Sequence, residues 1–347
     1  MHLEVVSGDV AGAINRWLHG VRVPSSIGVT GLRFRQNRLV AAARHRDMAK
    51  KTIEVDSLGT HALRRVSRHF ISRAARALRS PALSDTAVHE ARKDLKRART
   101  ALRLLRPALD ERSYRRENAL LRDVAHTFNA ARDAKVLTQT LQSLRRSHRA
   151  LRGDADATAL LRTLQTDQAK LRRWQQEHPA QLARTRVALE QSCRRGTQWR
   201  VGTHGWSVLG PALKRIYKSG RRARPTASRH PTASTLHEWR KQVKYLRYAL
   251  EMLTAMRSRR LARLARQAKQ LTDCLGEAHD LAMLVQKARL FAKRNRADLR
   301  LLFTIIEQQR ERLTGDALSN GERLYQAKPG DWQRLLKHYW MRRRRSS

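Results

Sequence analysis

Residues 89–96 of this chain have the sequence HEARKDLK, which recurs at residues 237–244 as HEWRKQVK. Each copy spaces its His, Arg, Lys and a following Arg by three, four and three residues. An α-helix has 3.6 residues per turn, so these four positions lie along one stripe of the helix surface. The repeated pattern therefore predicts two related cationic helices in a helical fold.

Two further segments repeat in the same order along the chain. Residues 62–68 (ALRRVSR) match residues 212–218 (ALKRIYK), and residues 128–133 (FNAARD) match residues 275–280 (LGEAHD). The spacing between the copies is nearly constant, which indicates an internal duplication. We therefore predict an all-α fold made of two pseudo-symmetric four-helix bundles that pack into one body.

Each charged stripe runs beside an apolar seam that is predicted to face a bundle core. The seam is Val88, Ala91, Leu95, Ala98, Leu102 and Leu105 in the first helix, and Leu236, Trp239, Val243, Leu246, Leu250 and Leu253 in the second. A charged side chain that borders a core must pair with an acid or line a cavity. The neighbouring acids Glu90 and Asp94 are predicted to point away from the stripe. This favours an anion-binding surface over the alternative, a solvated face of ion pairs.

The charge of the chain also favours an anionic partner. Its 347 residues include 74 Lys and Arg against 29 Asp and Glu, for a formal net charge of +45. Such an excess cannot be neutralised within the chain. Aromatic residues make up only 5% of the chain, which disfavours a surface built to stack nucleic-acid bases.

Other sequence features indicate the cellular compartment and the domain organisation. Cys193 and Cys274 give no disulfide framework, the first residues do not resemble a signal peptide, and no long apolar run is present. We therefore expect a cytoplasmic protein without a membrane span. Residues 1–58 are expected to be a weakly structured N-terminal segment of unknown role, with a short strand near Gly31 as the alternative.

Residues 59–342 are predicted to be one helical domain, with repeat halves at about 59–195 and 206–315 and a short C-terminal helix at about 331–342. The predicted helices are 60–79, 85–106, 112–149, 155–194, 206–223, 233–255, 259–293 and 295–314. Their breaks are predicted at Pro81, Gly153, 196–205, 225–231 and Gly315.

At these residues the chain resembles the CHAD family, the conserved histidine α-helical domain. The resemblance lies in the helices at 89–99 and 237–247, in residues 213–217, and in the pairs 132–133 and 279–280. It implies a domain whose basic residues line a central groove or pore that binds inorganic polyphosphate, and it implies an association with polyphosphate granules.

The resemblance also implies particular contacts to polyphosphate. In the first half they are His89, Arg92, Lys93, Lys96 and Arg99, and the stripe itself adds Arg103. In the second half they are His237, Arg240, Lys241, Lys244 and Arg247. Second-tier candidates are Lys214 and Arg215, with Arg64 and Arg65 as their repeat counterparts.

Some details depart from the family or stay open. His279 stands where the repeat partner of Arg132 is expected, and residues 1–58 lack the Glu-x-Glu-x-Lys pattern of a CYTH domain, so a stand-alone module is expected. A histidine close to phosphates is expected to have a raised pKa. The alternative is that His89 and His237 are neutral and only brace the helix start.

Catalysis and metal binding are not expected from the motifs. His89-Glu90 is similar to part of a zinc-protease motif, but Lys93 occupies the position of the second histidine and would oppose a metal. The carboxylates at positions 123, 133, 273 and 280 are predicted to pair with basic residues instead of binding a divalent ion. We predict no catalytic residue and no cofactor.

The leading hypothesis is a polyphosphate-binding module without catalysis. The alternatives are a non-specific nucleic-acid-binding protein that uses the same charge, and an enzyme that hydrolyses or transfers phosphate. The oligomeric state is not predicted.

Overall fold

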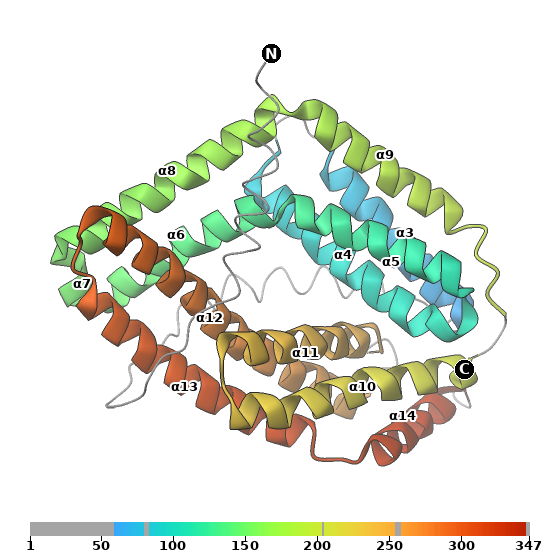
Figure 1. The fold of residues 1–347 in the computed structure, drawn as a ribbon. Helices are drawn as coiled ribbons and strands as arrows, with labels where there is room; N and C mark the ends of the chain where they lie inside the picture. The colour runs from blue at the N-terminus through green and yellow to red at the C-terminus, as the bar shows by residue number, and fades with distance from the viewer. Residues whose placement is uncertain (1–58, 80–82, 203–204, 254–257, 345–347) are drawn as a thin grey trace. The chain divides into compact units, whose positions relative to one another are not determined.

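The computed structural model describes residues 59–79, 83–202, 205–253 and 258–344, and this part of the chain contains helices and no strand (Figure 1). The first helices are α3 (Thr60–Ala77), α4 (Asp85–Leu105), the short η2 (Arg106–Ala108), α5 (Glu111–Thr127), α6 (Asn129–Ser147) and α7 (Arg149–Gly153). They are followed by α8 (Ala155–Glu177), α9 (Pro179–Arg195), α10 (Trp206–Arg229), α11 (Ala233–Leu253), α12 (Arg259–Asn295), α13 (Arg300–Leu324) and α14 (Pro329–Arg344). The predicted all-α class is confirmed. The N-terminal segment and its predicted strand lie outside the described residues.

Two predicted helices are each divided in the structure. The helix predicted at 112–149 is interrupted at Phe128, whose ring is fully buried between α5 and α6. The helix predicted at 155–194 is interrupted at His178, and Pro179 begins α9. Proline suits the first turn of a helix because its missing N–H would have no partner there.

The break predicted at Gly315 was wrong, and the break predicted at 225–231 begins only after Arg229, because packing maintains each helix across a weak helix former. Pro225 lies inside α10, and Ala227 beyond it is fully buried. Gly315 lies inside α13 between the buried residues Leu313 and Ala317. Glycine costs a helix about 1 kcal/mol relative to alanine, which is less than the burial of such flanking side chains contributes.

The apolar seams of α4 and α11 are confirmed, since all the predicted seam residues are buried. The start of α4 is fixed by Ser84, whose side chain accepts a hydrogen bond from the backbone N–H of Ala87 at 3.1 Å. This N-cap satisfies one of the free N–H groups of the first turn. The seam and the cap together set which face of α4 carries the charged stripe.

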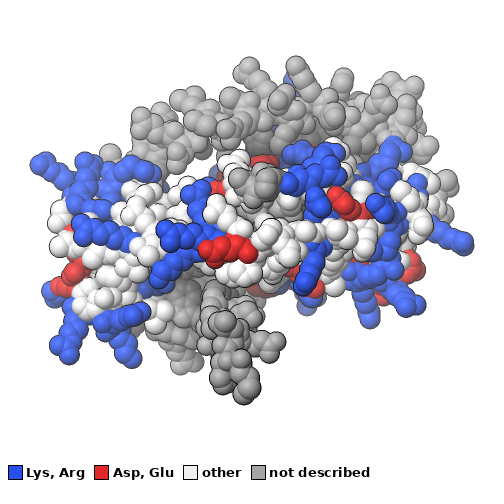
Figure 2. Space-filling model, turned by 90° about the horizontal axis from the view of Figure 1, so that it is seen from above, with Lys and Arg blue, Asp and Glu red and all other residues white. Residues whose placement is uncertain are grey.

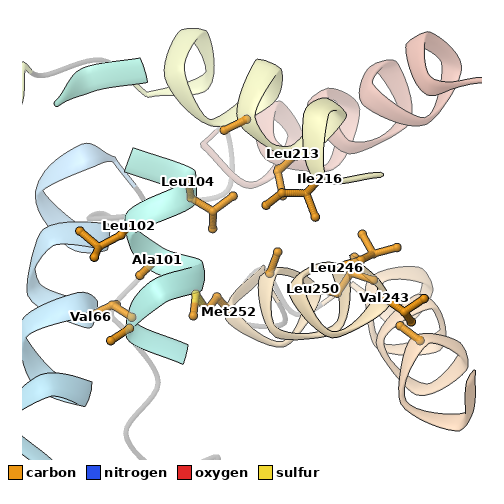
Figure 3. Packing of buried hydrophobic residues seen from close by; sticks show 14 of the residues in the cluster. Val66, Ala101, Leu102, Leu104, Leu213, Ile216, Val243, Leu246, Leu250 and Met252 are labelled. Carbon is orange, nitrogen blue, oxygen red and sulfur yellow. The ribbon is translucent and has the colours of Figure 1, made fainter. Parts of the chain in front are cut away.

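The larger of two hydrophobic cores joins both halves of the sequence. It includes side chains of α3, α4, α5 and α9 together with α10, α11 and α14. Figure 3 shows part of this core, with Leu104 of α4 directed toward Leu213 and Ile216 of α10. As a consequence α4 packs against both α10 and α11.

The second core is formed by α6 and α8 from the first half and by parts of α12 and α13 from the second. The long helix α12 contributes to both cores, with residues near α11 in one and residues near α6 in the other (Figure 1). Each core therefore draws on both halves, and the predicted arrangement of one bundle for each repeat is not confirmed. In the described residues, no helix is long and apolar enough to cross a membrane.

Candidate anion-binding site

The two charged stripes meet at Lys96 of α4 and Lys244 of α11, both of which are half-buried. Desolvation, together with the positive charges of Arg92 and Arg240, lowers the pKa of Lys96 to about 7. Desolvation also lowers the pKa of Lys244 well below its usual value, with Lys96 as the first of the charges that add to the shift. Residues that are far apart in the sequence thus form one positively charged site.

These cations are held next to neutral partners. Arg92 donates hydrogen bonds to the backbone oxygen of Ala125 at 2.5 Å and to Oδ1 of Asn129 at 2.6 Å. The Nε of Arg240 is buried and has no hydrogen-bond partner among the described residues. Within the same part of the chain, neither Lys96 nor Lys244 forms an ion pair. A buried cation without a carboxylate is costly unless a ligand supplies the negative charge.

Arg132 on α6 completes the site, although it was not among the predicted contacts. Its guanidinium pairs with Asp133 at 2.8 Å and with Asp280 of α12 at 3.2 Å. Its positive charge lowers the pKa of Lys96 and of Lys244, so it lies within reach of both stripes. Its place in the third repeated segment was the signal that could have identified it. We call Arg92, Lys96, Arg132, Arg240 and Lys244 the central cluster.

The histidines lie at the edge of the central cluster. His89 and His237 are exposed, and Nδ1 of His237 lies 3.4 Å from Nδ1 of His279 on α12. Desolvation lowers the pKa of all three, and that of His279 falls to about 2. The positive charge of Arg240 adds to this effect at His237 and His279. The charges of the protein itself therefore favour neutral imidazoles, and the predicted rise in pKa requires a phosphate nearby.

Several of the predicted contacts are ion-paired on the helix surface. Lys93 lies 3.2 Å from the glutamate three residues before it, and Lys241 forms the equivalent pair on α11. Arg247 pairs with Glu251 at 2.7 Å and lies 3.7 Å from Asp273. The Lys241 pair is exposed and is therefore worth at most about 1 kcal/mol, so a polyanion can compete for this lysine, whereas the pairs of Lys93 and Arg247 are half-buried.

Farther along α4, the stripe continues with neutral contacts. The Nε of Arg99 donates to Oδ1 of Asn118 at 3.1 Å. The guanidinium of Arg103 lies over the ring of Tyr245, 4.0 Å from its centroid. Arg99 and Arg103 thus extend the positive charge away from the central cluster without an acid between them. Tyr245 was also not predicted, because no sequence pattern marks an aromatic partner on another helix.

The second-tier candidates are dispersed. Arg64 donates to the backbone oxygens of Trp199 at 3.0 Å and Thr197 at 3.3 Å, which places it against the segment that follows α9. Arg65 and Lys214 are exposed, and within the described part of the chain neither forms a hydrogen bond or an ion pair with the central cluster. The exposed Arg215 lines a small cavity that Arg103 also lines. Of this group, only Arg215 is brought together with a stripe residue.

The acids that were predicted to pair with basic residues do so. Asp123 and Asp133 pair with the arginines that precede them at 2.8 Å, and Asp273 pairs with Lys269. Asp94 lies in the interior, 3.0 Å from Arg73, as expected for an acid that faces away from the stripe. In the described part of the chain, no three His, Cys, Asp or Glu residues are grouped so that they could hold a metal ion.

Positive charge is not confined to the site. Figure 2 shows Lys and Arg side chains spread over the face that is seen from above, with fewer Asp and Glu among them. This is the distribution that a net charge of +45 requires. A basic surface alone therefore does not locate the site. The distinguishing feature of the central cluster is that its cations are half-buried or buried, close together and short of carboxylates.

Comparisons with known proteins agree with this architecture. Among solved structures, PptA from Streptomyces chartreusis has a similar fold, with a TM-score of 0.54 and 17% sequence identity over 78% of this chain and 99% of PptA. The comparison with curated proteins found no match. The family model described as CHAD domain matches residues 61–289, which include both copies of the repeated helix. The chain therefore belongs to the CHAD domain family.

Proposed function

We propose that this protein binds inorganic polyphosphate through the central cluster and the two stripes that lead into it. The observation that carries the proposal is the meeting of Lys96 and Lys244 without a carboxylate partner for either among the described residues. Membership of the CHAD family, which is associated with polyphosphate, supports the choice of this polyanion.

A linear polyanion suits the site because it brings many negative charges in one chain. Binding releases condensed counterions and gains their entropy, so the affinity should fall steeply as salt is added. The arginines of the cluster can each hold two phosphate oxygens, whereas the lysines act as point charges. The outer stripe residues would then extend the contact along the bound chain.

The test compares a double variant of the central cluster with a matched control. Lys96→Met/Lys244→Met removes both lysines and keeps most of their apolar volume. We expect the Kd for long-chain polyphosphate at physiological salt to rise at least about tenfold, a loss of about 1.4 kcal/mol. Lys269→Met/Lys287→Met removes the same charge from α12, where each lysine pairs with an aspartate, and should change the Kd less than about threefold.

Circular dichroism and thermal unfolding establish that both variants fold. Equal affinities of the two folded variants for polyphosphate would overturn the proposal. RNA and double-stranded DNA, added at the same phosphate concentration as polyphosphate, test selectivity. If either displaces polyphosphate equally well, the site is a general polyanion site and the nucleic-acid alternative is favoured.

The proposal gives the protein a binding role without catalysis and an association with polyphosphate granules. Incubation of long-chain polyphosphate with the protein and Mg²⁺, followed by electrophoresis, should leave the chain length unchanged. Shortening that is absent from a mock purification would show an enzyme instead. Fluorescence microscopy of the tagged protein in cells that accumulate polyphosphate tests the granule association, and a diffuse signal would contradict it.

We also propose that the two halves derive from an internal duplication. The equivalent roles of α4 and α11 support this, because each presents a buried seam and a charged stripe to the same site. Arg132, which belongs to the central cluster, and His279, which borders it, occupy matching positions in the repeat. The duplication therefore accounts for a site assembled from both halves.

A further inference from the structure

A small cavity lies where α4, α5, α10 and α11 meet, beyond the central cluster. Its volume is about 50 Å³, and its polar lining includes Arg103, Arg106, Tyr114, Arg215, Ser219 and Tyr245. Its apolar wall includes Ile216, which Figure 3 shows on α10 next to Leu104 of α4. The lining contains no Asp or Glu. The cavity is therefore surrounded by hydrogen-bond donors and positive charge.

Two arginines of this cavity have N–H groups that are available to donate hydrogen bonds to a ligand. The Nε of Arg103 is buried and has no hydrogen-bond partner among the described residues, and its guanidinium stacks on Tyr245. Stacking on a ring face holds the plane of a guanidinium and leaves the N–H groups at its edge free to donate. Arg215 forms no ion pair in the described part of the chain. Arg106 is the exception, because it pairs with Glu111 at 3.0 Å.

We propose that this cavity binds a single dianionic phosphoryl group, either the terminal phosphate of a polyphosphate chain or free orthophosphate. The first of these sources rests on the proposed function. We name the cavity the phosphoryl pocket.

The size and charge of the phosphoryl pocket both fit this ligand. In the measure used for this cavity, one water molecule needs about 10–15 Å³, so a cavity of about 50 Å³ holds only a few waters and has room for one small tetrahedral anion and not for several linked phosphates. A phosphate group with two ionisable oxygens carries a charge of about −1.5 to −2 at neutral pH. A phosphate inside the chain has only one ionisable oxygen and therefore a single negative charge. Guanidinium groups match such an anion with paired hydrogen bonds.

The pocket lies at the end of the first charged stripe. Arg103 is one helical turn beyond Arg99 and two turns beyond Lys96 on α4, which places it about 10 Å along the helix axis from the central cluster. The positive charge of Arg103, acting after desolvation, helps to lower the pKa of Arg99. A chain that follows the stripe would thus reach the pocket with its end, while its inner phosphates remain at the central cluster.

The experiment compares a ligand that has ends with one that has none. Linear tripolyphosphate has two terminal phosphates and cyclic trimetaphosphate has only internal ones, although both contain three phosphorus atoms. We expect the wild-type protein to bind the linear form at least about fivefold more tightly than the cyclic form. Arg215→Ala should reduce this ratio to about twofold or less.

Lys218→Ala is the matched control, because Lys218 is an exposed cation on α10 that does not line the pocket. It removes the same charge and should leave the ratio close to that of the wild type. Arg103→Met is a second pocket variant. It tests the pocket independently of the long-range effect that the positive charge of Arg215 has on any anion. If Arg215→Ala and Arg103→Met both keep the wild-type ratio while folded, the pocket does not bind the end of a polyphosphate chain.

Orthophosphate distinguishes the two sources of the ligand. If free phosphate is the ligand, orthophosphate alone should bind the wild-type protein, and Arg215→Ala should bind it more weakly. If chain ends are the ligand, ³¹P spectra should show the terminal resonance of tripolyphosphate broadened more than the internal one, and Arg215→Ala should remove that difference. Neither effect in the wild-type protein would overturn the proposal.

Failure of this proposal is separable from failure of the proposed function. The proposed function is judged by long chains and by Lys96→Met/Lys244→Met. The phosphoryl pocket is judged by short ligands and by Arg215→Ala. A pocket that fails therefore leaves the polyphosphate site at the central cluster in place, and a central cluster that fails leaves the pocket as a separate phosphate site.

Discussion

The Nη2 of Arg132 on α6 donates a hydrogen bond to Oδ1 of Asp280 on α12, over 3.2 Å and 148 positions of sequence. The other terminal nitrogen of Arg132 donates to Asp133 at 2.8 Å. One guanidinium thus occupies both carboxylates that border the central cluster. This arrangement joins the two halves beside the site and leaves Lys96 and Lys244 without an acid partner among the described residues.

Neutralising Asp280 should strengthen polyphosphate binding. In the protein without a ligand, the negative charge of Asp280 favours the charged forms of Arg240 and Lys244. Asp280→Asn removes this charge, so a bound polyanion no longer competes with it. It also frees one edge of Arg132 for phosphate. We expect the Kd for polyphosphate to fall about threefold to tenfold, and the free energy of unfolding to fall by about 1–2 kcal/mol because a charge-assisted hydrogen bond is weakened. Fluorescence titration at fixed salt and urea denaturation measure the two effects.

Asp167→Asn is the control for this prediction. It makes the same change in net charge at a half-exposed pair with Lys287, 2.7 Å away on α12. Its effect on the Kd should be less than about twofold. Weaker binding by folded Asp280→Asn would show that Asp280 serves the site by positioning Arg132, and it would contradict the expected direction.

Asp94 should be essential for stability and not for binding. Its carboxylate is 1% exposed and lies 3.0 Å from Arg73 and 3.4 Å from Arg97, which is itself 3% exposed. Without the Asp94 charge, Arg97 keeps only Glu251, 3.8 Å away, as an acid partner among the described residues. Breaking a buried ion pair in this way costs about 3–5 kcal/mol. We expect Asp94→Asn to lower the free energy of unfolding by about this amount in urea denaturation. Asp123→Asn removes an exposed partner of Arg122 and should cost less than about 1 kcal/mol.

If Asp94→Asn is as stable as Asp123→Asn, the buried pair is not a stabilising feature of α4. A folded Asp94→Asn protein should also bind polyphosphate with an affinity close to that of the wild type. This second measurement separates the buried face of α4 from its charged stripe.

Glu117 links α5 to α9 and should contribute stability that is lost in acid. It accepts hydrogen bonds from Ser192 at 2.6 Å and from Arg195 at 2.7 Å. Although desolvation acts to raise its pKa, these hydrogen bonds lower it below the usual 4.5. A lowered pKa in the folded state stabilises the protein fully above about pH 4.5, and the contribution disappears as the pH falls through the lower, folded value.

Urea denaturation of the wild type and Glu117→Gln at several pH values tests this link. The variant should be less stable by about 2–3 kcal/mol at neutral pH, and the difference should shrink below about pH 4.5. Glu111→Gln removes an exposed partner of Arg115 and serves as the control. A difference that stays constant from neutral pH to about pH 3 would show that the ionisation of Glu117 has no part in stability.

The fold could be predicted where helical periodicity carries the information. The seams of α4 and α11 follow a strict heptad pattern, and every residue of them is buried. The ends of the helices were harder to predict than the helices themselves, because tertiary contacts determine where a helix ends. Pro225 and Gly315 stay helical within packed helices, and Phe128 ends α5 where its ring enters the core. No local signal at these positions distinguishes the outcomes.

The site could be predicted as far as each helix determines its own surface. The spacing within each stripe predicts that Arg92 and Lys96 share a face, and the repeat predicts the same for α11. The partners of that face depend on which helices pack beside it. Tyr245 therefore escaped prediction, since only the packing of α11 against α4 brings it to Arg103, and Arg132 was marked by the repeat alone. Whether a cation forms an ion pair also depends on the three-dimensional structure. Lys93 pairs with Glu90, whereas Lys96, on the same helix, forms no ion pair among the described residues.

Polyphosphate binding should take up protons near neutral pH. The pKa of Lys96 is about 7 because of desolvation and the positive charges of Arg92 and Arg240. A bound polyanion favours the ammonium and raises this pKa, so the complex holds more protons than the free protein between the two values, and the affinity falls as the pH rises through that range. Calorimetric titration at about pH 7.5, in two buffers that differ in protonation enthalpy, should give different heats and a net uptake of protons.

Lys96→Met should reduce the uptake, whereas Lys287→Met, which removes a lysine paired with Asp167, should not. Heats that are independent of the buffer for the wild-type protein would show that the central cluster is already fully protonated before polyphosphate binds.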